Sequence, residues 1–428
     1  MRRAAAVAML ALSGTAVAAC SSGASSSASG GTTPSSSTAG STGGSKVTLT
    51  YDIWDGNQLK GMQAVAKAFE AANPDIAVNV QLIPGQAYFT KLQTSIPSGT
   101  APDVFWMSSI FFQQFAAGGA LANLSGVGLD ASAYPQQLVK GCQVNGTQYG
   151  VPKDFDTVGL WYNKALFKSA GVALPTASWT WADYENAAAK LTSKSTGVFG
   201  TAAELDGQQG FYNAVFQNGG YILGPDGKGT GWTQPKTVAA LQFWDDLVAK
   251  GYSPGVAQMT DTAPLDMFLG GKVAMLWLGS WNVPAIATSA VKNDVNVVPL
   301  PTGTQRATVI NGLCNVVYAK SQHPQQAAKF AAFLGSKQAN EIQAQTGTVI
   351  PAYNGTQSAW VKAYPQYNLQ AYLDELPYAQ PYPVNANTYP WLMASATALG
   401  KAFAGAESVA TAAQQSQAAT DSALTPAG

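Results

Sequence analysis

Charged residues are scarce in this chain. Asp, Glu, Lys and Arg make up 11% of its 428 residues, and the formal net charge at pH 7 is zero. A protein that binds nucleic acid through its phosphates needs clustered Lys and Arg, so this composition argues against that class. Arginine is especially rare, because Arg306 is the only one outside the first three residues. Phosphate and carboxylate ligands are usually held by arginine, so the sequence favours a neutral polar ligand.

Residues that commonly carry catalysis or bind metals are also few. The single histidine, His323, precedes Pro324 at the expected start of a helix, which is a poor place for a general base. Cys142 and Cys314 lie in no recognisable nucleophile motif. They could form a disulfide in an oxidising exterior or remain two buried thiols. No spacing indicates a metal site and no Gly-rich phosphate loop is present, so we expect neither metal nor cofactor.

No segment is apolar for long enough to span a bilayer as a helix. The chain opens MRRAAAVAMLALSGTAVAAC, in which two arginines precede a short apolar run, as in secretory signals. Val17–Cys20 resembles a bacterial lipobox; the alternative is an ordinary cleaved signal with a chance cysteine. We expect a signal peptide at 1–19 and lipid on Cys20, which would anchor the protein at the extracellular face of a bacterial membrane. Segment 20–45, rich in Ser, Gly, Thr and Ala, would then be a flexible tether.

Aromatic residues, by contrast, are plentiful, with 11 Trp and 17 Tyr. Early in the body of the chain, residue patterns predict strands at 47–54, 76–82 and 103–107, with a helix between each pair. This β-α-β-α-β order implies a mostly parallel sheet with right-handed crossovers. In such sheets, ligands bind at the carboxyl ends of the strands. The later chain continues in this style, with strands predicted at 272–281 and 295–301.

Eight stretches, in this order, resemble the family 1 extracellular solute-binding proteins, which are the capture subunits of carbohydrate ABC importers and relatives of maltose-binding protein. They include AVAKAFEAANPDIAVNV, GTAPDVFWMSS, YGVPKDFDTVGLWYNKALF, FLGGKVAMLWLGSW and HPQQAAKFAAFLGS. The resemblance covers nearly the whole body. It implies an α/β fold: a two-lobe, periplasmic-binding-protein-like clamshell, each lobe a mostly parallel sheet flanked by helices, joined by a multi-strand hinge.

The resemblance also implies an organisation and a function. Cys142 and Cys314 would fall near the hinge on adjacent strands, which favours the disulfide. The expected function is capture of a neutral mono- or oligosaccharide between the lobes by hinge closure, followed by delivery to ABC permease subunits, by a protein that is itself a monomer. The implied boundaries are 46–155 with 313–361 for the N-terminal lobe and 156–312 with 362–428 for the C-terminal lobe.

Candidate ligand residues at two strand ends suit a neutral sugar, whose hydroxyls prefer carboxylate and amide partners and whose C–H faces prefer aromatic planes. Trp54 and Asp55 end the first predicted strand, and Trp106 and Ser108 end the third. Core packing is the alternative for each tryptophan.

Further candidates come from the resemblance. Asp156 lines up with an acidic ligand contact of the maltose-binding branch, and a solvated loop carboxylate is its alternative. Trp281 matches an aromatic platform of the family, and Trp391 falls near a late stacking aromatic, with Asn387 as a polar partner. Tyr212 is a further candidate. For each of these aromatics the alternative is core packing.

Other functions remain as alternatives. A secreted glycosidase needs two carboxylates across the scissile bond, about 5–9.5 Å apart. Asp154 and Asp156 are two residues apart on one strand and point alike, so they cannot flank a bond, and we expect no enzyme. Asp154 itself is either a ligand contact or a surface residue. A binder of polyamine or peptide is the other alternative, and a polyamine would need a carboxylate-rich cleft.

Overall fold

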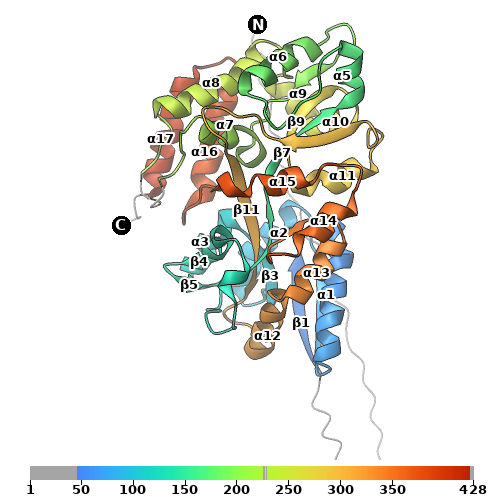
Figure 1. Cartoon of the computed structure of the whole chain (residues 1–428). Coiled ribbons are helices and arrows are strands. Elements are labelled where there is room, and N and C mark those ends of the chain that lie inside the picture. The colour runs from blue at the N-terminus through green and yellow to red at the C-terminus, as the bar shows by residue number, and fades with distance from the viewer. Residues whose placement is uncertain (1–45, 225–226, 228, 425–428) are drawn as a thin grey trace, which may run out of the picture. The chain divides into compact units, whose positions relative to one another are not determined.

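The computed structural model describes residues 46–224, 227 and 229–424 (Figure 1). The predicted signal, tether and lipid-bearing Cys20 lie outside these residues. Within the described part of the chain, no helix is both long and apolar enough to cross a membrane.

The first sheet has the strand order β12-β6-β11-β3-β1-β2, and β13 pairs with β11. β1 buries alternate apolar side chains at Leu49, Tyr51 and Ile53, as a half-buried strand should. β1 runs parallel to β2 and β3, as the sequence predicts. The strands are β1 (Val47–Ile53), β2 (Ile76–Leu82), β3 (Val104–Ser108), β6 (Gly150–Asp156), β11 (Thr308–Val317), β12 (Ile350–Pro351) and β13 (Ala379–Pro381).

The sheets are mixed, which differs from the mostly parallel sheets expected. β11 is antiparallel to both β3 and β6, because the chain returns along β11 from the second sheet. In the second sheet, of order β10-β7-β9-β8, only β8 and β9 are parallel. Its strands are β7 (Val158–Asn163), β8 (Phe199–Thr201), β9 (Val273–Gly279) and β10 (Val295–Pro299); β4 (Gln143–Val144) and β5 (Thr147–Gln148) form a separate hairpin.

Helices with one apolar face cover the sheets. In α1, Met62, Val65 and Phe69 are buried at helical spacing, as predicted. α12 begins at Pro324, whose missing N–H costs nothing in a first turn. The helices around the first sheet are α1 (Leu59–Ala72), α2 (Gln86–Ser98), α3 (Ser109–Ala117), α4 (Gln136–Gly141), α12 (Pro324–Leu334), α13 (Lys337–Gln345) and α14 (Gln357–Ala363).

The helices around the second sheet are α5 (Lys164–Ala170), α6 (Trp181–Leu191), α7 (Tyr212–Gln217), α8 (Pro235–Ala249), α9 (Val256–Asp261), α10 (Pro264–Leu269), α11 (Val283–Thr288), α15 (Gln370–Asp374), α16 (Thr388–Phe403) and α17 (Val409–Leu424).

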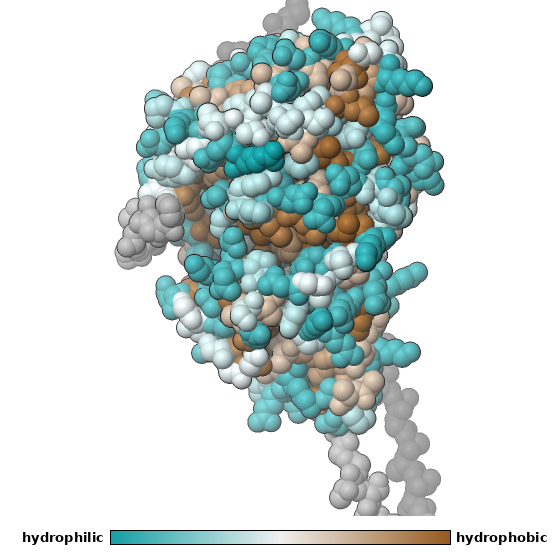
Figure 2. All heavy atoms as spheres, in the orientation of Figure 1, coloured by the Kyte–Doolittle hydropathy of each residue, from teal (hydrophilic) through white to brown (hydrophobic). Residues whose placement is uncertain are grey.

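The chain crosses between the sheets at β6–β7 and at β11 (Figure 1). β6 ends at Asp156, and the amide of Val158, at the start of β7, donates to the hydroxyl of Thr308. Residues 308–310 of β11 pair with β13, whereas 311–317 pair with β6 and β3. β11 therefore continues as one strand beyond its pairs with β3 and β6, as far as Thr308 beside the start of β7. The face drawn in Figure 2 is mainly polar, with apolar side chains gathered across its middle.

A disulfide ties this crossing to α4. Cys142, the residue after α4, is bonded to Cys314 of β11, and their Cα atoms are 5.9 Å apart. Both cysteines are buried, at 2% and 3% exposure. The bond therefore fixes the position of α4 against the crossing strand.

Candidate functional site

The centre of the candidate site is Asp156, at the end of β6. Its Oδ1 accepts a hydrogen bond of 2.6 Å from the hydroxyl of Ser280, which follows β9 of the second sheet. Asp156 also pairs across the ladder with Asn311 of β11. One half-buried carboxylate thus lies where both sheets and both crossing segments meet.

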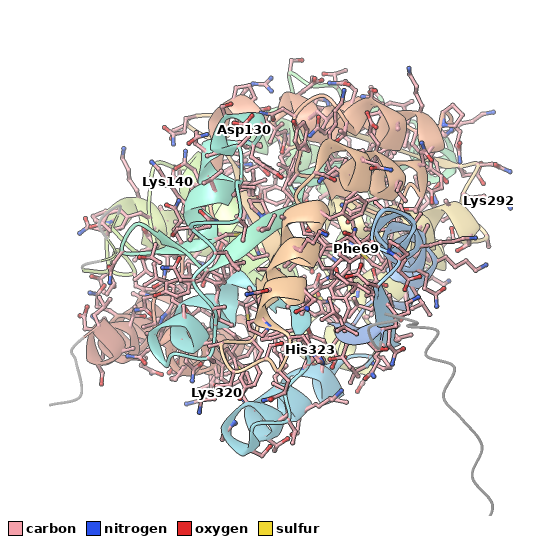
Figure 3. The ribbon with its side chains drawn as sticks, turned by 90° about the horizontal axis from the view of Figure 1, so that it is seen from below. Phe69, Asp130, Lys140, Lys292, Lys320 and His323 are labelled. Carbon is pink, nitrogen blue, oxygen red and sulfur yellow. A yellow bond between two sulfur atoms is a disulfide. The ribbon has the colours of Figure 1, made fainter. Side chains whose placement is uncertain are left out.

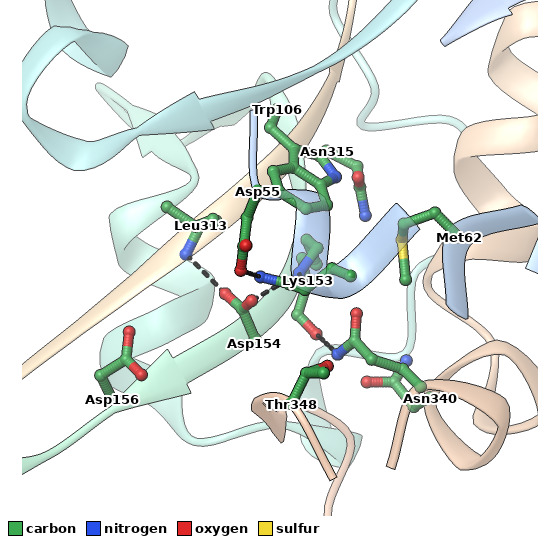
Figure 4. A network of polar contacts seen from close by, with 12 residues as sticks. Asp55, Met62, Trp106, Lys153, Asp154, Asp156, Leu313, Asn315, Asn340 and Thr348 are labelled. Carbon is green, nitrogen blue, oxygen red and sulfur yellow. Dashed lines mark hydrogen bonds and ion pairs between the residues drawn. The ribbon is translucent and has the colours of Figure 1, made fainter. Parts of the chain in front are cut away.

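A buried polar network holds the first-sheet side of the site (Figure 4). Lys153 Nζ lies 2.5 Å from the carboxylate of Asp154 and donates to Gln58 Oε1 at 2.6 Å. Gln58 in turn donates to the carboxylate of Asp55, after β1. Asp154 also accepts from the amide of Leu313. Asp154 is therefore buried and paired, contrary to the surface alternative considered for it.

Amide side chains form the second-sheet side. Gln209 Oε1 accepts from the backbone of Gly279 and from the side chain of Asn282, while its Nε2 donates to Glu204. The neighbouring Gln208 accepts from Asn311 Nδ2 at 2.9 Å. The Gly207–Phe211 turn (η3) thereby fixes the loop that follows β9 (η4, Ser280–Asn282).

The pKa values of two carboxyls in this region are shifted in the same direction. Burial, followed by the negative charge of Asp154, raises the pKa of Asp156 to about 7, against the opposing Ser280 hydrogen bond. Burial and the nearby Asp206 likewise raise the pKa of Glu204 to about 7. Near neutral pH, each of these carboxyls can accept hydrogen bonds when ionised or donate one when protonated.

Trp281 is the aromatic residue on the second-sheet side of the site, and with Gln209 it forms what we call the second-sheet wall. It follows Ser280 and is partly exposed. Its ring lies directly against the backbone of Gly279, where an added Cβ would be only 1.8 Å from a ring carbon. Glycine at 279 is therefore a steric requirement of this tryptophan orientation.

Trp54 is the aromatic residue on the first-sheet side of the site, and with Asp55 it forms what we call the first-sheet wall. It is partly exposed, and its ring packs edge-on against Tyr88 and Trp106 and obliquely against Phe89. Asp55 follows it and is fixed by the hydrogen bond that it accepts from the amide of Asn57. The structure therefore brings Trp54 and Asp55 to the surface of this wall in a rigid arrangement.

Trp106 lies in the core instead of at the surface, which corrects its prediction as a ligand contact. It is fully buried, its indole N–H donates to Tyr51 at 2.6 Å, and the Lys153 ammonium lies 4.2 Å from the ring centroid. Its role is to support the network of Lys153. Ser108, by contrast, is partly exposed, and its hydroxyl accepts from the amide of Ile110 as the N-cap of α3.

Three further candidates also lie away from the site. Tyr212 is fully buried beneath Gly207 of the η3 turn, so it supports the turn from below. Trp391 is 1% exposed and its indole donates to Asn385 within the second-sheet core. Asn387 donates to the carbonyl of Ala423 and so ties the start of α16 to α17. The packing of α16 and α17 decides the positions of Trp391 and Asn387.

An aromatic residue that the sequence reasoning missed lies two positions before Trp391. Tyr389 is 43% exposed, and its ring centroid is 5.3 Å from that of Phe111 on α3, so it connects the elements of the two sheets. The helical pattern contained the signal: Trp391, Ser395 and Leu399 repeat every four residues on the buried face of α16. Tyr389 does not lie on that face.

Other site residues had no comparable sequence signal. The local sequence indicates only secondary structure around four polar residues of the site: Gln208, Gln209, Asn311 and Ser280. Their convergence depends on how the η3 turn, β11 and β9 are placed in three dimensions.

The described residues contain no group of His, Cys, Asp and Glu that could hold a metal ion. His323, labelled in Figure 3, is the N-cap residue of α12. The site thus consists of carboxyl, amide and hydroxyl groups, with the partly exposed Trp54 on its first-sheet side and Trp281 on its second-sheet side.

The comparisons identify the family. Residues 55–341 match the family described as bacterial extracellular solute-binding protein, and the chain belongs to it. An ABC substrate-binding protein from Listeria monocytogenes, solved in complex with cycloalternan, is 32% identical with a TM-score of 0.82, and the match covers 88% of this chain and 98% of that one. The two-lobe α/β prediction is thereby confirmed.

Two other relatives are similar over most of their length. The cyclic alpha-maltosyl-1,6-maltose binding protein of Arthrobacter globiformis is 25% identical, with a TM-score of 0.76, over 88% of this chain and 98% of that one. The maltooligosaccharide ABC transporter solute-binding lipoprotein of Streptococcus pneumoniae is 27% identical over 68% of this chain and 69% of its own.

Proposed function

We propose that this protein captures a neutral oligosaccharide for an ABC importer, holding it between the Trp54 and Asp55 wall and the Trp281 and Gln209 wall. The observation that carries the proposal is the placement of Asp156. This half-buried carboxyl lies at the crossing of the two sheets and is bonded to Ser280, the neighbour of the partly exposed Trp281. Ring planes bury the C–H faces of a sugar, and a fixed carboxylate accepts from its hydroxyls.

The proposed substrate class is an α-linked gluco-oligosaccharide, linear or cyclic. It rests on the printed ligands of the relatives: cycloalternan, cyclic maltosyl-maltose and malto-oligosaccharide. The Arg-poor composition agrees, since an anionic ligand would call for arginine.

Binding is proposed to close the lobes about the β6–β7 and β11 crossings. Each wall belongs to a different sheet, so a ligand that touches both gains contacts that a more open arrangement lacks. A ligand shifts a conformational equilibrium by that difference in affinity. The closed form would then be recognised by the permease subunits.

A lipid on Cys20 would hold the protein, as a monomer, at the extracellular face of the membrane. No catalytic role is proposed. Asp154 is neutralised by Lys153 and held by Leu313, so it is not available as the partner carboxyl that a glycosidase needs.

The polyamine alternative is less well supported. Asp55, Asp156 and Glu204 do supply carboxyls, but the raised pKa values of Asp156 and Glu204 mean that the site resists full ionisation. Asp154 already carries its own cation in Lys153. A site built for a polycation would keep its carboxylates ionised and unpaired.

A thermal-shift screen tests the proposal. Ligand at one hundred times its Kd stabilises the folded protein by about 2.7 kcal/mol, a shift of several degrees. We expect malto-oligosaccharides or cyclic α-glucans to raise the Tm and spermidine and peptides not to. Stabilisation by spermidine alone would contradict the proposed substrate class and favour the polyamine alternative.

A further inference from the structure

A hollow of about 1210 Å³ lies beside the crossing strands, and none of the residues proposed above to contact the ligand lines it. Its walls come from α3 and α4, from residues 219–224 after α7, and from the end of β13. It also reaches β11 between Ile310 and Cys314. Ligand pockets typically measure about 300–1,000 Å³, so this hollow can hold more than one sugar ring.

Gly312 of β11 faces the hollow, and its neighbour Asn311 lies between the hollow and the Asp156 site. Asn311 pairs with Asp156, whereas the next residue, Gly312, pairs with Phe155. Successive side chains of a strand point to opposite faces. Leu138 of α4 packs on the Gly312 face, where an added Cβ would lie 3.0 Å from its Cδ2, and Leu138 lines the hollow. Asn311 also lines the hollow and donates to Gln208, so the two sites adjoin each other at this residue.

Several polar groups around the hollow have no partner in the described part of the chain. The hydroxyl of Ser109 is buried without a hydrogen bond. The side chains of Gln113, Gln137 and Gln380 likewise make no hydrogen bond to other described residues. Gln305, by contrast, is committed to the carbonyl of Phe216. Buried polar groups are normally satisfied, so the unpaired Ser109 hydroxyl is available to a ligand. The Gln113 amide is partly exposed and the Gln137 and Gln380 amides are exposed, so a ligand can reach them.

Flat apolar faces accompany these groups. Phe216 and Tyr382 are largely buried at the wall, and Tyr221 is 38% exposed. The charged residues among the described lining are Lys140 and Lys236, both exposed at the rim (Figure 3 labels Lys140). Lysines would repel a polyamine, whereas amides and rings suit hydroxyls and C–H faces.

We propose that this hollow is a second ligand site, which takes a neutral oligosaccharide independently of the Asp156 site. The unpartnered Ser109 hydroxyl and the Gln113, Gln137 and Gln380 amides would bind its hydroxyls, and Phe216 and Tyr382 would pack against its rings.

The test is the number of oligosaccharides bound per chain, measured by isothermal titration with maltotetraose and with cycloalternan. Gln113→Trp places an indole in the hollow, and Gln114→Trp, on the same helix but outside the lining, is the matched control. We expect two molecules bound to the native protein and to the control, and one to Gln113→Trp.

The same titration separates this proposal from the proposed function. Trp281→Ala should weaken only the first site, and Gln113→Trp should weaken only the second by at least tenfold. One molecule per native chain for both probes, or two in a folded Gln113→Trp protein, would overturn the second site. If Gln113→Trp loses binding while Trp281→Ala loses none, the result would support the second site and count against the first.

Discussion

The hydroxyl of Ser280 donates to the Asp156 carboxylate at 2.6 Å, and this bond joins a loop of the second sheet to a strand of the first. Asp156 is also the carboxyl whose pKa burial raises to about 7. A single side chain thus combines a link between the sheets with a pKa near neutral pH.

Asp156→Asn is predicted to separate ligand binding from stability. The amide loses the charged acceptor, so we expect oligosaccharide affinity to fall by about tenfold, the difference between a charge-assisted and a neutral hydrogen bond. The free protein at pH 8 should instead gain stability, by about 1–2 kcal/mol after solvent screening, because a buried charge is removed. Titration calorimetry and urea unfolding measure the two effects. Loss of the folded state would show that Asp156 is structural.

Stability should fall with rising pH around neutrality. The folded pKa of Asp156 and that of Glu204, both about 7, lie above their ordinary values, so the folded protein holds these protons more tightly than the unfolded chain. Their stabilising contribution is complete below about pH 4 and is lost as the pH rises through 7. Urea midpoints of the native protein and of Asp156→Asn between pH 5 and 9 measure it. Parallel curves for the two proteins would contradict the assignment to Asp156.

Trp281→Ala is predicted to weaken oligosaccharide binding by about tenfold or more, because stacking contributes roughly 0.5–1.5 kcal/mol beyond the buried area. Trp281→Phe keeps a flat ring and is the matched control, for which we expect a smaller loss. The Tm should barely change, since the side chain is partly exposed. Unchanged affinity in a folded Trp281→Ala protein would remove Trp281 from the site.

Gly279→Ala tests the orientation of the same ring. The new methyl would lie 1.8 Å from the Trp281 ring carbon, so the indole must move and affinity should fall about as far as in Trp281→Ala. In the Trp281→Ala background the methyl has nothing to displace, and its added cost should nearly vanish. Additive losses in this double-mutant cycle would mean that Gly279 acts independently.

Tyr389 and Trp391 should behave oppositely. Tyr389→Ala removes an exposed ring and should leave the stability nearly unchanged. Trp391→Ala opens a cavity in the second-sheet core and should destabilise the protein by about 3–5 kcal/mol. Chemical unfolding and calorimetry of both variants give the comparison. A stable Trp391→Ala protein that has lost binding would restore the prediction that Trp391 contacts the ligand.

Reduction of the Cys142–Cys314 bond should lower the free energy of unfolding by about 2–5 kcal/mol, since the bond closes a long loop in the unfolded chain. The measurement is the urea midpoint with and without dithiothreitol. The Cys142→Ala, Cys314→Ala protein is the control and should not respond to the reductant. An equal response in both would show that the reductant acts elsewhere.

The sequence by itself determined the elements and their order. The alternation in β1 and β2, the apolar face of α1 and the proline at the start of α12 are local patterns, and each is found where the pattern predicts it. The positions of Trp54 and Asp55 also followed, because a strand end has a fixed place in a parallel unit.

The tertiary structure alone decided which side chains meet. Trp106, Tyr212 and Trp391 are chemically suited to a sugar, yet packing against neighbouring elements buried them, and it left Tyr389 exposed. Gln208, Gln209 and Ser280 converge on the crossing strands from segments far apart in the chain. Local pattern fixes the face of an element on which a residue lies. Only the packing of elements fixes whether that face is covered.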